Sequence, residues 1–362
     1  MTHLVVAITA HGFGHAAQVA PVLDELWRRD RALRLTLLTE LPEPFLRARI
    51  EAPFSYCAHA MDFGLCMKSV FEIDREASLE RYRGMHSDWS ATVDRAARFL
   101  AGLAPDCVLA DVPYLALAAA RRLGVPGVAL CSLNWADIVE HYFEAVPEAE
   151  RWLVQMRDAY RGAELFIRPE PAMPMAWLDN AAAVGAIGRR GRTLRDRLAR
   201  MPRLAHARHL LLAAPGGIET RLPIESWTVA PDTVWLVPDS WASRHPNLVA
   251  TGSLPLPFID ILASVDGVLG KCGYGTVVEC VINGTPLAYL PRPDWPEEAG
   301  LVDWLRGHDA GAAIDGATLA GGGADEILAA CRRLNILRVE PRGIAEAADL
   351  VRQYMPANGA LA

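Results

Sequence analysis

A glycine-rich turn occupies Gly270-Lys-Cys-Gly-Tyr-Gly-Thr-Val-Val-Glu279 in the second half of the chain. An apolar run, Gly267–Leu269, precedes it and the helical pattern of Thr276–Ile282 follows it. The expected local structure is therefore a buried strand, a tight turn and a helix. Glycines let backbone amides approach a ligand closely, and a helix start presents N–H groups with partial positive charge. With the added charge of Lys271, this pattern is typical of a diphosphate site.

Each part of this turn has an expected role. Backbone amides would come from a run of small or aromatic residues: Gly273, Tyr274, Gly275 and Thr276. We expect Glu279 in the first helical turn, where its carboxylate could hold two ribose hydroxyls. An alternative needs no ligand, because Thr276-Val-Val-Glu279 also matches a capping box and glycine can serve a tight turn alone.

Outward from this turn, short apolar runs alternate with helical patterns in both halves of the chain. This alternation predicts an α/β protein with two doubly wound parallel sheets. The expected strands are Leu4–Ala10, Leu33–Leu38, Phe54–Ala58, Cys107–Ala110, Val125–Cys131, Leu210–Ala214, Thr233–Val237, Leu248–Ala250, Gly267–Leu269 and Leu287–Leu290. The expected helices are Ala16–Arg28, Ser78–Leu103 with a break near Gly84, Tyr114–Leu123, Pro257–Ser264, Thr276–Ile282 and Glu297–Arg306.

The proline-rich segment Arg168–Pro174 predicts the edge of a domain. We therefore expect a first Rossmann-like domain at residues 1–167 and a second at 168–344. A helix from about residue 345 would pack back on the first domain.

Open parallel sheets bind ligands beyond the carboxyl ends of their strands, where the strand order reverses. For an assumed order 3-2-1-4-5, this point lies between the first and fourth strands. In the first half, these strands deliver His11–His15 and Asp111; in the second half, they deliver Gly216–Gly217 and Lys271–Thr276. Two facing domains would then enclose a cleft with both sites.

The composition restricts the function classes. The chain has 362 residues, enough for two cores, and a formal net charge of −7, which argues against a nucleic-acid partner. No apolar run has the length of a membrane span, and the start lacks the cleavage pattern of a signal peptide. Seven cysteines without a CxxC pair predict reduced thiols, a cytoplasmic location and no metal site.

The segment Lys271–Glu279, with Gly284-Thr-Pro286 and Pro291, resembles the donor-site signature of GT-B glycosyltransferases. The resemblance implies two facing Rossmann-like domains and a nucleotide sugar, most commonly a UDP-sugar, held by the second. It assigns the amides of Tyr274–Thr276 to the diphosphate and Glu279 to the ribose. Lys271 stands where many members have histidine. Glu298, in Asp294-Trp-Pro-Glu-Glu298, departs from the family's sugar-binding Asp-Gln pair, and acidic residues also favour a first helical turn.

The turn His11-Gly-Phe-Gly-His15 resembles the acceptor loop of the same family, and Val108-Leu-Ala-Asp111 resembles its aspartate segment. The resemblance implies that His15 or His11 removes the acceptor proton and that Asp111 orients the imidazole. Histidine suits this role because it titrates near neutrality. His15 is preferred because it starts the helix; either histidine could instead cap or pack.

A narrower resemblance covers nearly the whole chain. Its motifs are His11–His15, Asp74-Arg-Glu-Ala-Ser-Leu-Glu80, Ser132-Leu-Asn-Trp135 and Gly270–Thr276. They are similar to the glycosyltransferase-like amino-terminal half of plant L-arabinokinases and to bacterial stand-alone proteins described as glycosyltransferases. No glycine- and serine-rich ATP loop of the kinase half is present, so sugar kinase activity is not expected.

Two further segments have open interpretations. Met61–Ile73, with Asp62 and Lys68, could line an acceptor pocket or form a packed loop, and Trp135 could stack on a sugar or belong to the core. Arg189–Arg208 contains eight arginines and one acid. A solvated helix face explains it, and weak contact with an anionic membrane surface is the alternative.

Together these features predict a glycosyltransferase that moves a sugar from a nucleotide-diphosphate sugar to an acceptor hydroxyl. By resemblance it is inverting and metal-independent, with no tightly bound cofactor. The alternatives are a non-catalytic nucleotide-sugar-binding module and a GT-B-type sugar-nucleotide epimerase. The expected partners are the nucleotide sugar and the small-molecule acceptor.

Overall fold

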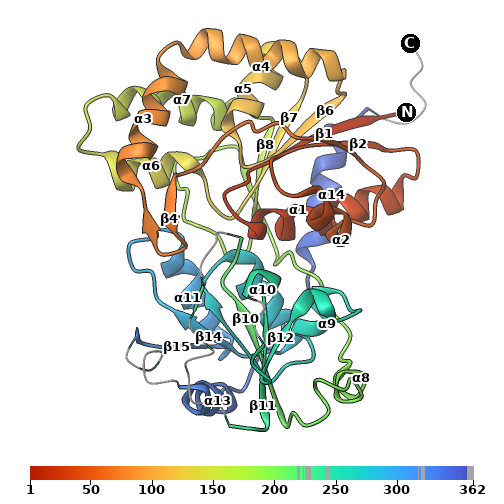
Figure 1. The fold of residues 1–362 in the computed structure, drawn as a ribbon. Helices are drawn as coiled ribbons and strands as arrows, with labels where there is room; N and C mark the ends of the chain where they lie inside the picture. The colour runs from red at the N-terminus through yellow and green to blue at the C-terminus, as the bar shows by residue number, and fades with distance from the viewer. Residues whose placement is uncertain are drawn as a thin grey trace. The chain divides into compact units, whose positions relative to one another are not determined.

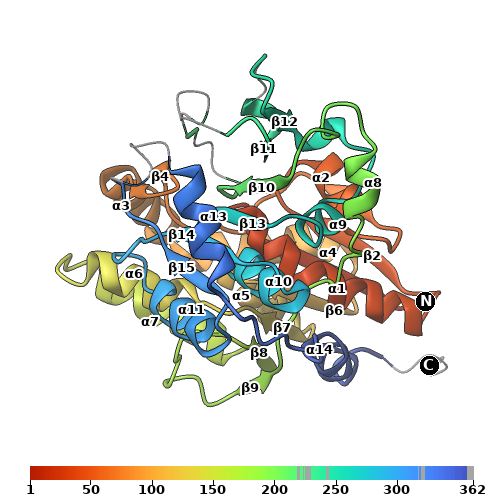
Figure 2. The same cartoon turned by 90° about the horizontal axis from the view of Figure 1, so that it is seen from below.

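The computed structural model describes residues 1–217, 221–222, 224, 230–241, 244–316, 318 and 323–356. The chain divides into two compact units. Unit 1 comprises Met1–Ile187 and Arg342–Ala362, and unit 2 comprises Gly188–Pro341. Each unit contains a parallel sheet with helices packed on it (Figures 1 and 2).

The sheet of unit 1 has the order β3-β2-β1-β6-β7-β8-β9, and all its strands are parallel. Its strands are β1 (His3–Ile8), β2 (Arg34–Leu38), β3 (Ser55–Cys57), β6 (Cys107–Asp111), β7 (Gly127–Leu130), β8 (Leu165–Pro169) and β9 (Ala181–Val184). Its helices are α1 (Phe13–Arg29), α2 (Glu43–Arg49), α3 (Arg75–His86), α4 (Trp89–Leu103), α5 (Tyr114–Leu123), α6 (Trp135–Phe143), α7 (Ala149–Arg161) and α14 (Gly343–Arg352). A small antiparallel hairpin consists of β4 (Met67–Ser69) and β5 (Glu72–Ile73).

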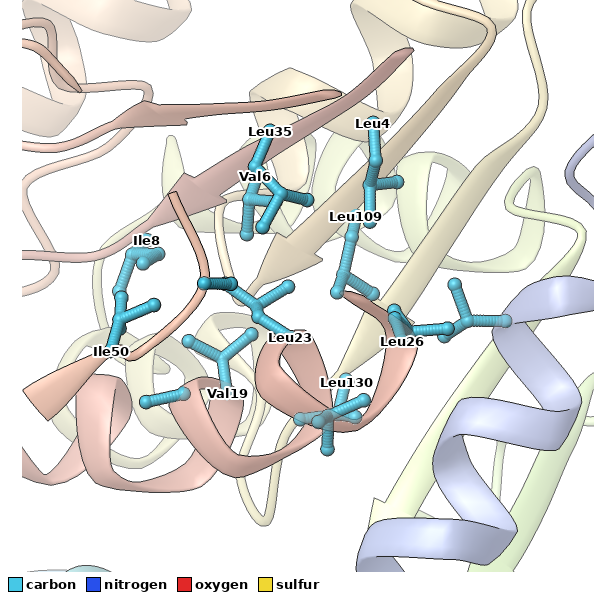
Figure 3. Packing of buried hydrophobic residues seen from close by; sticks show 14 of the residues in the cluster. Leu4, Val6, Ile8, Val19, Leu23, Leu26, Leu35, Ile50, Leu109 and Leu130 are labelled. Carbon is cyan, nitrogen blue, oxygen red and sulfur yellow. The ribbon is translucent and has the colours of Figure 1, made fainter. Parts of the chain in front are cut away.

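Every residue of β1 is buried, so both faces of the sheet are covered. On one face, the side chains of Leu4, Val6 and Ile8 pack with those of α1, among them Val19 and Leu23 (Figure 3). Side chains alternate along a strand, and the period of the helix brings apolar residues three and four apart to one face. These two periodicities explain why the helix settles on the sheet.

The helix expected after residue 345 is α14, and it belongs to unit 1. Ala347, Ala348 and Val351 join the same apolar cluster as β1 and α1. Arg29 of α1 forms an ion pair with Asp349 of α14.

The sheet of unit 2 has the order β12-β11-β10-β13-β14-β15, again parallel throughout. Its strands are β10 (His209–Ala214), β11 (Thr233–Val237), β12 (Leu248–Ala250), β13 (Gly267–Lys271), β14 (Leu287–Leu290) and β15 (Gly311–Ala313). Its helices are α8 (Arg195–Ala199), α9 (Phe258–Leu262), α10 (Tyr274–Asn283), α11 (Glu298–Gly307) and α13 (Ala324–Arg332). A core of apolar side chains joins the sheet to α13, among them Leu211, Trp235, Leu269 and Ile327.

These sheets confirm the predicted fold class, and they confirm the assumed strand order as well. In both units, the first strand lies between the second and the fourth of the parallel sheet. The reversal of strand order therefore lies at β1 and β6 in unit 1 and at β10 and β13 in unit 2.

The boundary between the units differs from the prediction. Unit 2 starts at Gly188 rather than at Arg168. The proline-rich segment is a connection inside unit 1, because β8 before it and β9 after it pair as neighbours in the first sheet. Proline marked the end of a strand there, not the end of a domain.

Two smaller features also differ. Gly84 lies inside α3, and the helical pattern is interrupted at Ser87 and Asp88 instead. The Asp88 carboxylate accepts a hydrogen bond from the Ala91 amide and so caps a new helix, α4. Met61–Ile73 is not only a loop, since it contains the hairpin of β4 and β5.

Candidate active site

In unit 1, the start of α1 and the end of β6 bring His15 and Asp111 together. Ile8 of β1 pairs with Asp111 of β6, so the chain leaving β1 passes the end of β6 before α1 begins at Phe13. Nδ1 of His15 lies 2.9 Å from Oδ1 of Asp111. The histidine is 9% exposed and the aspartate 0%. Two predicted site residues, 96 positions apart in sequence, are thus in hydrogen-bond contact.

This contact assigns the tautomer of the imidazole. An ionised carboxylate only accepts hydrogen bonds, so Nδ1 of His15 carries the proton that it donates to Asp111. Nε2 then carries the lone pair and is the nitrogen able to take a proton from a substrate. The arrangement has the chemistry of a general base oriented by an acid.

His11 has different surroundings. Its Nδ1 accepts a long hydrogen bond of 3.5 Å from the Leu65 amide, and its ring meets Trp135 edge-on with centroids 5.1 Å apart. The carboxylate of Asp111 lies within hydrogen-bond distance of His15. The assignment of the base to His15 stays a prediction, and the 2.9 Å contact with Asp111 is the observation behind it.

Cys131, which follows β7, adds a third group to this site. Its Sγ lies 3.7 Å from Nδ1 of His15. Among the described residues, His15, Asp111 and Cys131 form a group that could hold a metal ion, with one ligand atom each within 4.8 Å of the others. Nδ1 of His15 lies 2.9 Å from Asp111 and 3.7 Å from Cys131, so a metal ion bound through this nitrogen would replace the hydrogen bond to Asp111.

Behind the histidines lie Trp135 and Asp62. Trp135 is fully buried, so it belongs to the core and does not present a face for sugar stacking. Its indole N–H donates a 2.6 Å hydrogen bond to Oδ2 of Asp62. Burial raises the pKa of Asp62 to about 6, although hydrogen bonds from Thr9 and Trp135 oppose the shift. The segment with Asp62 thus contacts Trp135, whose ring packs against His11 and His15.

In unit 2, Lys271 ends β13 and its side chain lies between two glycine turns. A Cβ atom on Gly216, in the turn after β10, would come within 2.9 Å of Cε of Lys271. A Cβ atom on Gly273 would come within 3.5 Å of its Nζ. The structure thus brings Gly216, predicted from the turn after the first strand of unit 2, next to Lys271 and Gly273 of the Gly270–Thr276 motif. Gly217 follows in the same turn and is exposed.

The neighbours of Lys271 give its charged form little stabilisation. Among the residues that the structure describes, none accepts a hydrogen bond from its ammonium group. Burial, together with the positive charge of Arg292, lowers the pKa of Lys271 to about 7. The negative charges of Glu297 and Glu298 act in the opposite direction but do not cancel this shift.

Arg292 was missed in the sequence, although its place directly after a buried strand is a usable signal. It is 8% exposed and donates a 2.9 Å hydrogen bond to the Cys272 carbonyl. Its Nε lies 3.5 Å from Oε2 of Glu298, and burial raises the pKa of that carboxyl. Glu298 therefore has a structural partner of its own and stands at the start of α11, as acidic residues commonly do.

The start of α10 differs from the prediction. The helix begins at Tyr274, with Gly273 as its N-cap and no side-chain cap. Thr276 and Glu279 therefore do not form a capping box, because both lie inside the helix. The first turn contains Tyr274, Gly275 and Thr276, whose amides have no acceptors within the helix itself.

Glu279 lies in the second turn of α10, not in the first. It is 2% exposed, and its Cγ would lie 3.4 Å from a Cβ atom on Gly188. The ribose role assigned to it stays a prediction.

The basic segment Arg189–Arg208 is largely used inside unit 2. Arg192 pairs with Asp260 at 2.6 Å, and Arg203 donates to the Leu248 carbonyl at 2.8 Å. Arg190, Arg195 and Arg208 also have acidic partners, Glu340, Asp266 and Asp232. No helix in the described part of the chain is long and apolar enough to cross a bilayer.

The fold is shared with solved glycosyltransferase structures. The glycotransferase of kitacinnamycin superposes with a TM-score of 0.61 at 17% identity, covering 98% of this chain and 99% of that one. CalG4, the calicheamicin glycosyltransferase, gives 0.60 at 20% identity, with 98% of both chains covered. UGT2 of Phytolacca americana, complexed with UDP-2-fluoro-glucose and pterostilbene, gives 0.54 at 15% identity over 98% and 94%.

Among curated proteins, L-arabinokinase of Arabidopsis thaliana is 27% identical over 328 residues, which cover 85% of this chain. The match spans 30% of the length of that relative. No protein-family model matches the chain. With two Rossmann-like units, each with its switch point between the first and fourth strands, and with these structural neighbours, the chain has the GT-B fold of glycosyltransferases.

Proposed function

We propose that this protein is a glycosyltransferase that moves a sugar from a nucleoside-diphosphate sugar to a hydroxyl group of a small acceptor. The observation that carries the proposal is that each unit has a chemically distinct group of residues at its switch point, the place in the sheet where the strand order reverses. Unit 1 has the base-like His15 and Asp111 at β1 and β6, and unit 2 has a cation between glycine turns at β10 and β13.

Unit 2 would bind the donor. A diphosphate needs positive charge and N–H donors, and Lys271 with the first turn of α10 supplies both. Glycine at positions 216 and 273 lets the backbone approach the ligand closely. Glu279 would receive the ribose hydroxyls. A UDP-sugar is the favoured donor, since UGT2 of Phytolacca americana holds UDP-2-fluoro-glucose.

Unit 1 would supply the base. Nε2 of His15 takes the proton from the acceptor hydroxyl. The oxygen of that hydroxyl forms a bond to the anomeric carbon of the donor sugar. The bond from that carbon to the diphosphate oxygen breaks, and the electron pair leaves with the nucleoside diphosphate. Asp111 stabilises the imidazolium that forms. Attack opposite the leaving group inverts the anomeric centre.

Charge on the departing diphosphate would be stabilised by Lys271 and the α10 amides. These groups take the role that a divalent cation has in other transferases, so we propose turnover without a metal ion. Unchanged rates in EDTA would support this part of the proposal, and loss of activity restored by Mg²⁺ would contradict it.

The test begins with binding of UDP, GDP and dTDP by thermal shift, since a ligand of the native state raises the melting temperature. UDP-, GDP- and dTDP-sugars are then incubated with the protein and with acceptor mixtures. Sugar transfer or slow donor hydrolysis supports the proposal. Tight binding without turnover indicates a binding module, and an isomerised donor indicates an epimerase.

His15→Ala with His11→Ala as its matched control assigns the base. We expect the first variant to lose turnover by about 10²–10⁴-fold while binding nucleotide normally, because general base catalysis contributes about that much. Unchanged turnover in His15→Ala would overturn the assignment.

A further inference from the structure

The N-terminal residue of α6, Trp135, has contacts in unit 1 that the proposed chemistry does not use. Its backbone N–H donates to the Tyr160 hydroxyl at 3.2 Å, and its indole N–H donates to Asp62 at 2.6 Å. The Tyr160 hydroxyl in turn donates to the carbonyl of Val112 at 2.9 Å, directly after Asp111. The backbone of Trp135, through Tyr160, thus connects to the end of β6, and its indole connects to Asp62.

The ring of Trp135 also lies against both histidines of the site. Its centroid is 5.1 Å from that of His11 and 6.4 Å from that of His15. Aromatic rings at these separations are in packing contact. The tryptophan is fully buried, so it acts on the site through position and not by contact with a ligand.

The segment around Gly64 is shaped to fit this ring. Gly64 has φ +61°, and a Cβ atom there would come within 2.6 Å of Trp135 and 2.9 Å of Nδ1 of His11. Its carbonyl accepts a 2.7 Å hydrogen bond from the Tyr82 hydroxyl. The segment is therefore held from both sides, against Trp135 on one and by Tyr82 on the other.

We propose that Asp62, Trp135 and Tyr160 form a brace that keeps the imidazole of His15 aligned with Asp111. The three side chains are positioning residues, since none of them is assigned a contact with substrate. The brace fixes both ends of the hydrogen bond at once, because Tyr160 holds the residue after Asp111 and the tryptophan ring packs beside His15. Its effect on turnover rests on the proposed function, whereas its effect on His15 does not.

The test reads the tautomer of His15 directly. The protein is labelled with ¹⁵N-histidine, and the His15 signals are identified by their absence in His15→Ala. In the wild type, we expect one tautomer with the proton on Nδ1. In Trp135→Phe, which keeps an aromatic ring but removes the indole donor, we expect a mixture of tautomers.

Two variants supply matched comparisons. Asp62→Asn keeps an oxygen that can accept the indole N–H, so His15 should retain its wild-type signals. Trp177→Phe removes a second indole–carboxylate bond of 2.7 Å, to Asp137 of the same helix α6, and should also leave His15 unchanged. This control separates the brace from a general disturbance of α6.

Turnover supplies a second readout. If donor hydrolysis or transfer is measurable, Trp135→Phe should lower kcat by about 10–100-fold through misalignment, with the KM for the donor within twofold of wild type. Wild-type tautomer signals in Trp135→Phe, or equal changes in Trp177→Phe, would overturn the brace. If Trp135→Phe does not fold, Tyr160→Phe tests the same alignment from the β6 end, with the same expected and contradicting results. A failure of nucleotide binding or transfer would count against the proposed function and leave the tautomer result intact.

Discussion

Nδ1 of His15 donates its proton to Oδ1 of Asp111 across 2.9 Å, inside a site where the carboxylate is completely buried. An ionised carboxylate accepts hydrogen bonds and cannot donate them, so this contact places the proton of a neutral imidazole on Nδ1. In the proposed mechanism, the basicity of His15 at Nε2 therefore depends on Asp111.

Asp111→Asn should consequently lower turnover by about 10²–10⁴-fold, without weakening nucleotide binding. The asparagine amide can donate to Nδ1 and thereby place the proton on Nε2, which then cannot act as a base. Steady-state kinetics with the donor that the nucleotide-sugar screen selects measures this. Asp106→Asn, just before β6, keeps an oxygen that can accept from the His3 amide and should leave turnover within about threefold. Equal rates in Asp111→Asn and wild type would contradict the orienting role.

Affinity for a nucleoside diphosphate should fall as the pH rises from 7 to 9. The pKa of Lys271 is about 7 in the free protein, so the side chain is charged below this value and largely neutral above it. A bound diphosphate favours the charged form of Lys271, so binding is coupled to the uptake of a proton. The affinity therefore falls as the pH rises above the pKa of the free protein. Isothermal titration with UDP at several pH values, in buffers of different ionisation enthalpy, measures both the affinity and the proton uptake.

Lys271→Arg should bind UDP with little dependence on pH in this range, because arginine stays charged. Lys271→Met should bind roughly 10–100-fold more weakly at pH 7, the effect of losing a hydrogen bond to a charged group. A pH-independent affinity in the wild type would show that Lys271 does not charge on binding.

The two glycines beside Lys271 should differ in their tolerance of alanine. Gly216 has φ +103°, and its added Cβ would meet Cε of Lys271 at 2.9 Å, so Gly216→Ala should displace the lysine and weaken UDP binding. Gly273→Ala would place its Cβ at an ordinary contact distance of 3.5 Å from Nζ and should cost much less. Parallel titrations of the two variants compare them directly; equal losses would contradict the predicted clash at Gly216, and no loss in Gly216→Ala would argue that the turn after β10 has no part in binding.

The Asp62 carboxyl should make the stability of the protein depend on pH. Its pKa of about 6 in the folded protein lies above the ordinary value of 3.8, so the folded state binds this proton more tightly than the unfolded state. The free energy of unfolding of wild type relative to Asp62→Asn should therefore rise as the pH falls from about 7 to 4, by on the order of 3 kcal/mol. Urea unfolding of both proteins at each pH measures the difference. A constant difference over this range would mean that Asp62 ionises normally.

Gly64→Ala should destabilise unit 1 by roughly 2–4 kcal/mol, since alanine disfavours φ +61° and its Cβ would clash with Trp135 and His11. Gly84→Ala is the matched control. It lies in α3 with no atom within 4 Å of an added Cβ, and should stabilise by about 0.5–1 kcal/mol. Thermal unfolding compares them, and similar melting temperatures for both would refute the tight fit at Gly64.

Local patterns were sufficient to predict the two parallel sheets. Runs such as Cys107–Asp111 and Gly267–Lys271 are buried on both faces, and a strand of this kind is apolar along its length. Ligand-type residues directly after such strands marked the sites, because topology places these ends together. His15, Asp111 and Lys271 were predicted in this way, and the structure places His15 and Asp111 in contact at the ends of their elements.

The boundary between the two units depended on which strands pair, and no local sequence pattern contains that information. Arg168–Pro174 looks like a domain edge, but β9 returns to the first sheet and carries unit 1 on to Ile187. In the same way, Thr276-Val-Val-Glu279 reads as a helix start, yet α10 begins at Tyr274 because Gly273 turns the chain earlier.

By itself, the sequence determined the fold class, the order of elements and the residues at the strand ends, since these follow from periodicity and turn chemistry over a few positions. Only the tertiary structure decided that His15 contacts Asp111, that the charge of Arg292 acts on Lys271, and that Tyr160 and Asp62 accept hydrogen bonds from Trp135. Contacts between residues 25 to more than 90 positions apart depend on how strands and helices pack, and that packing is a property of the whole unit.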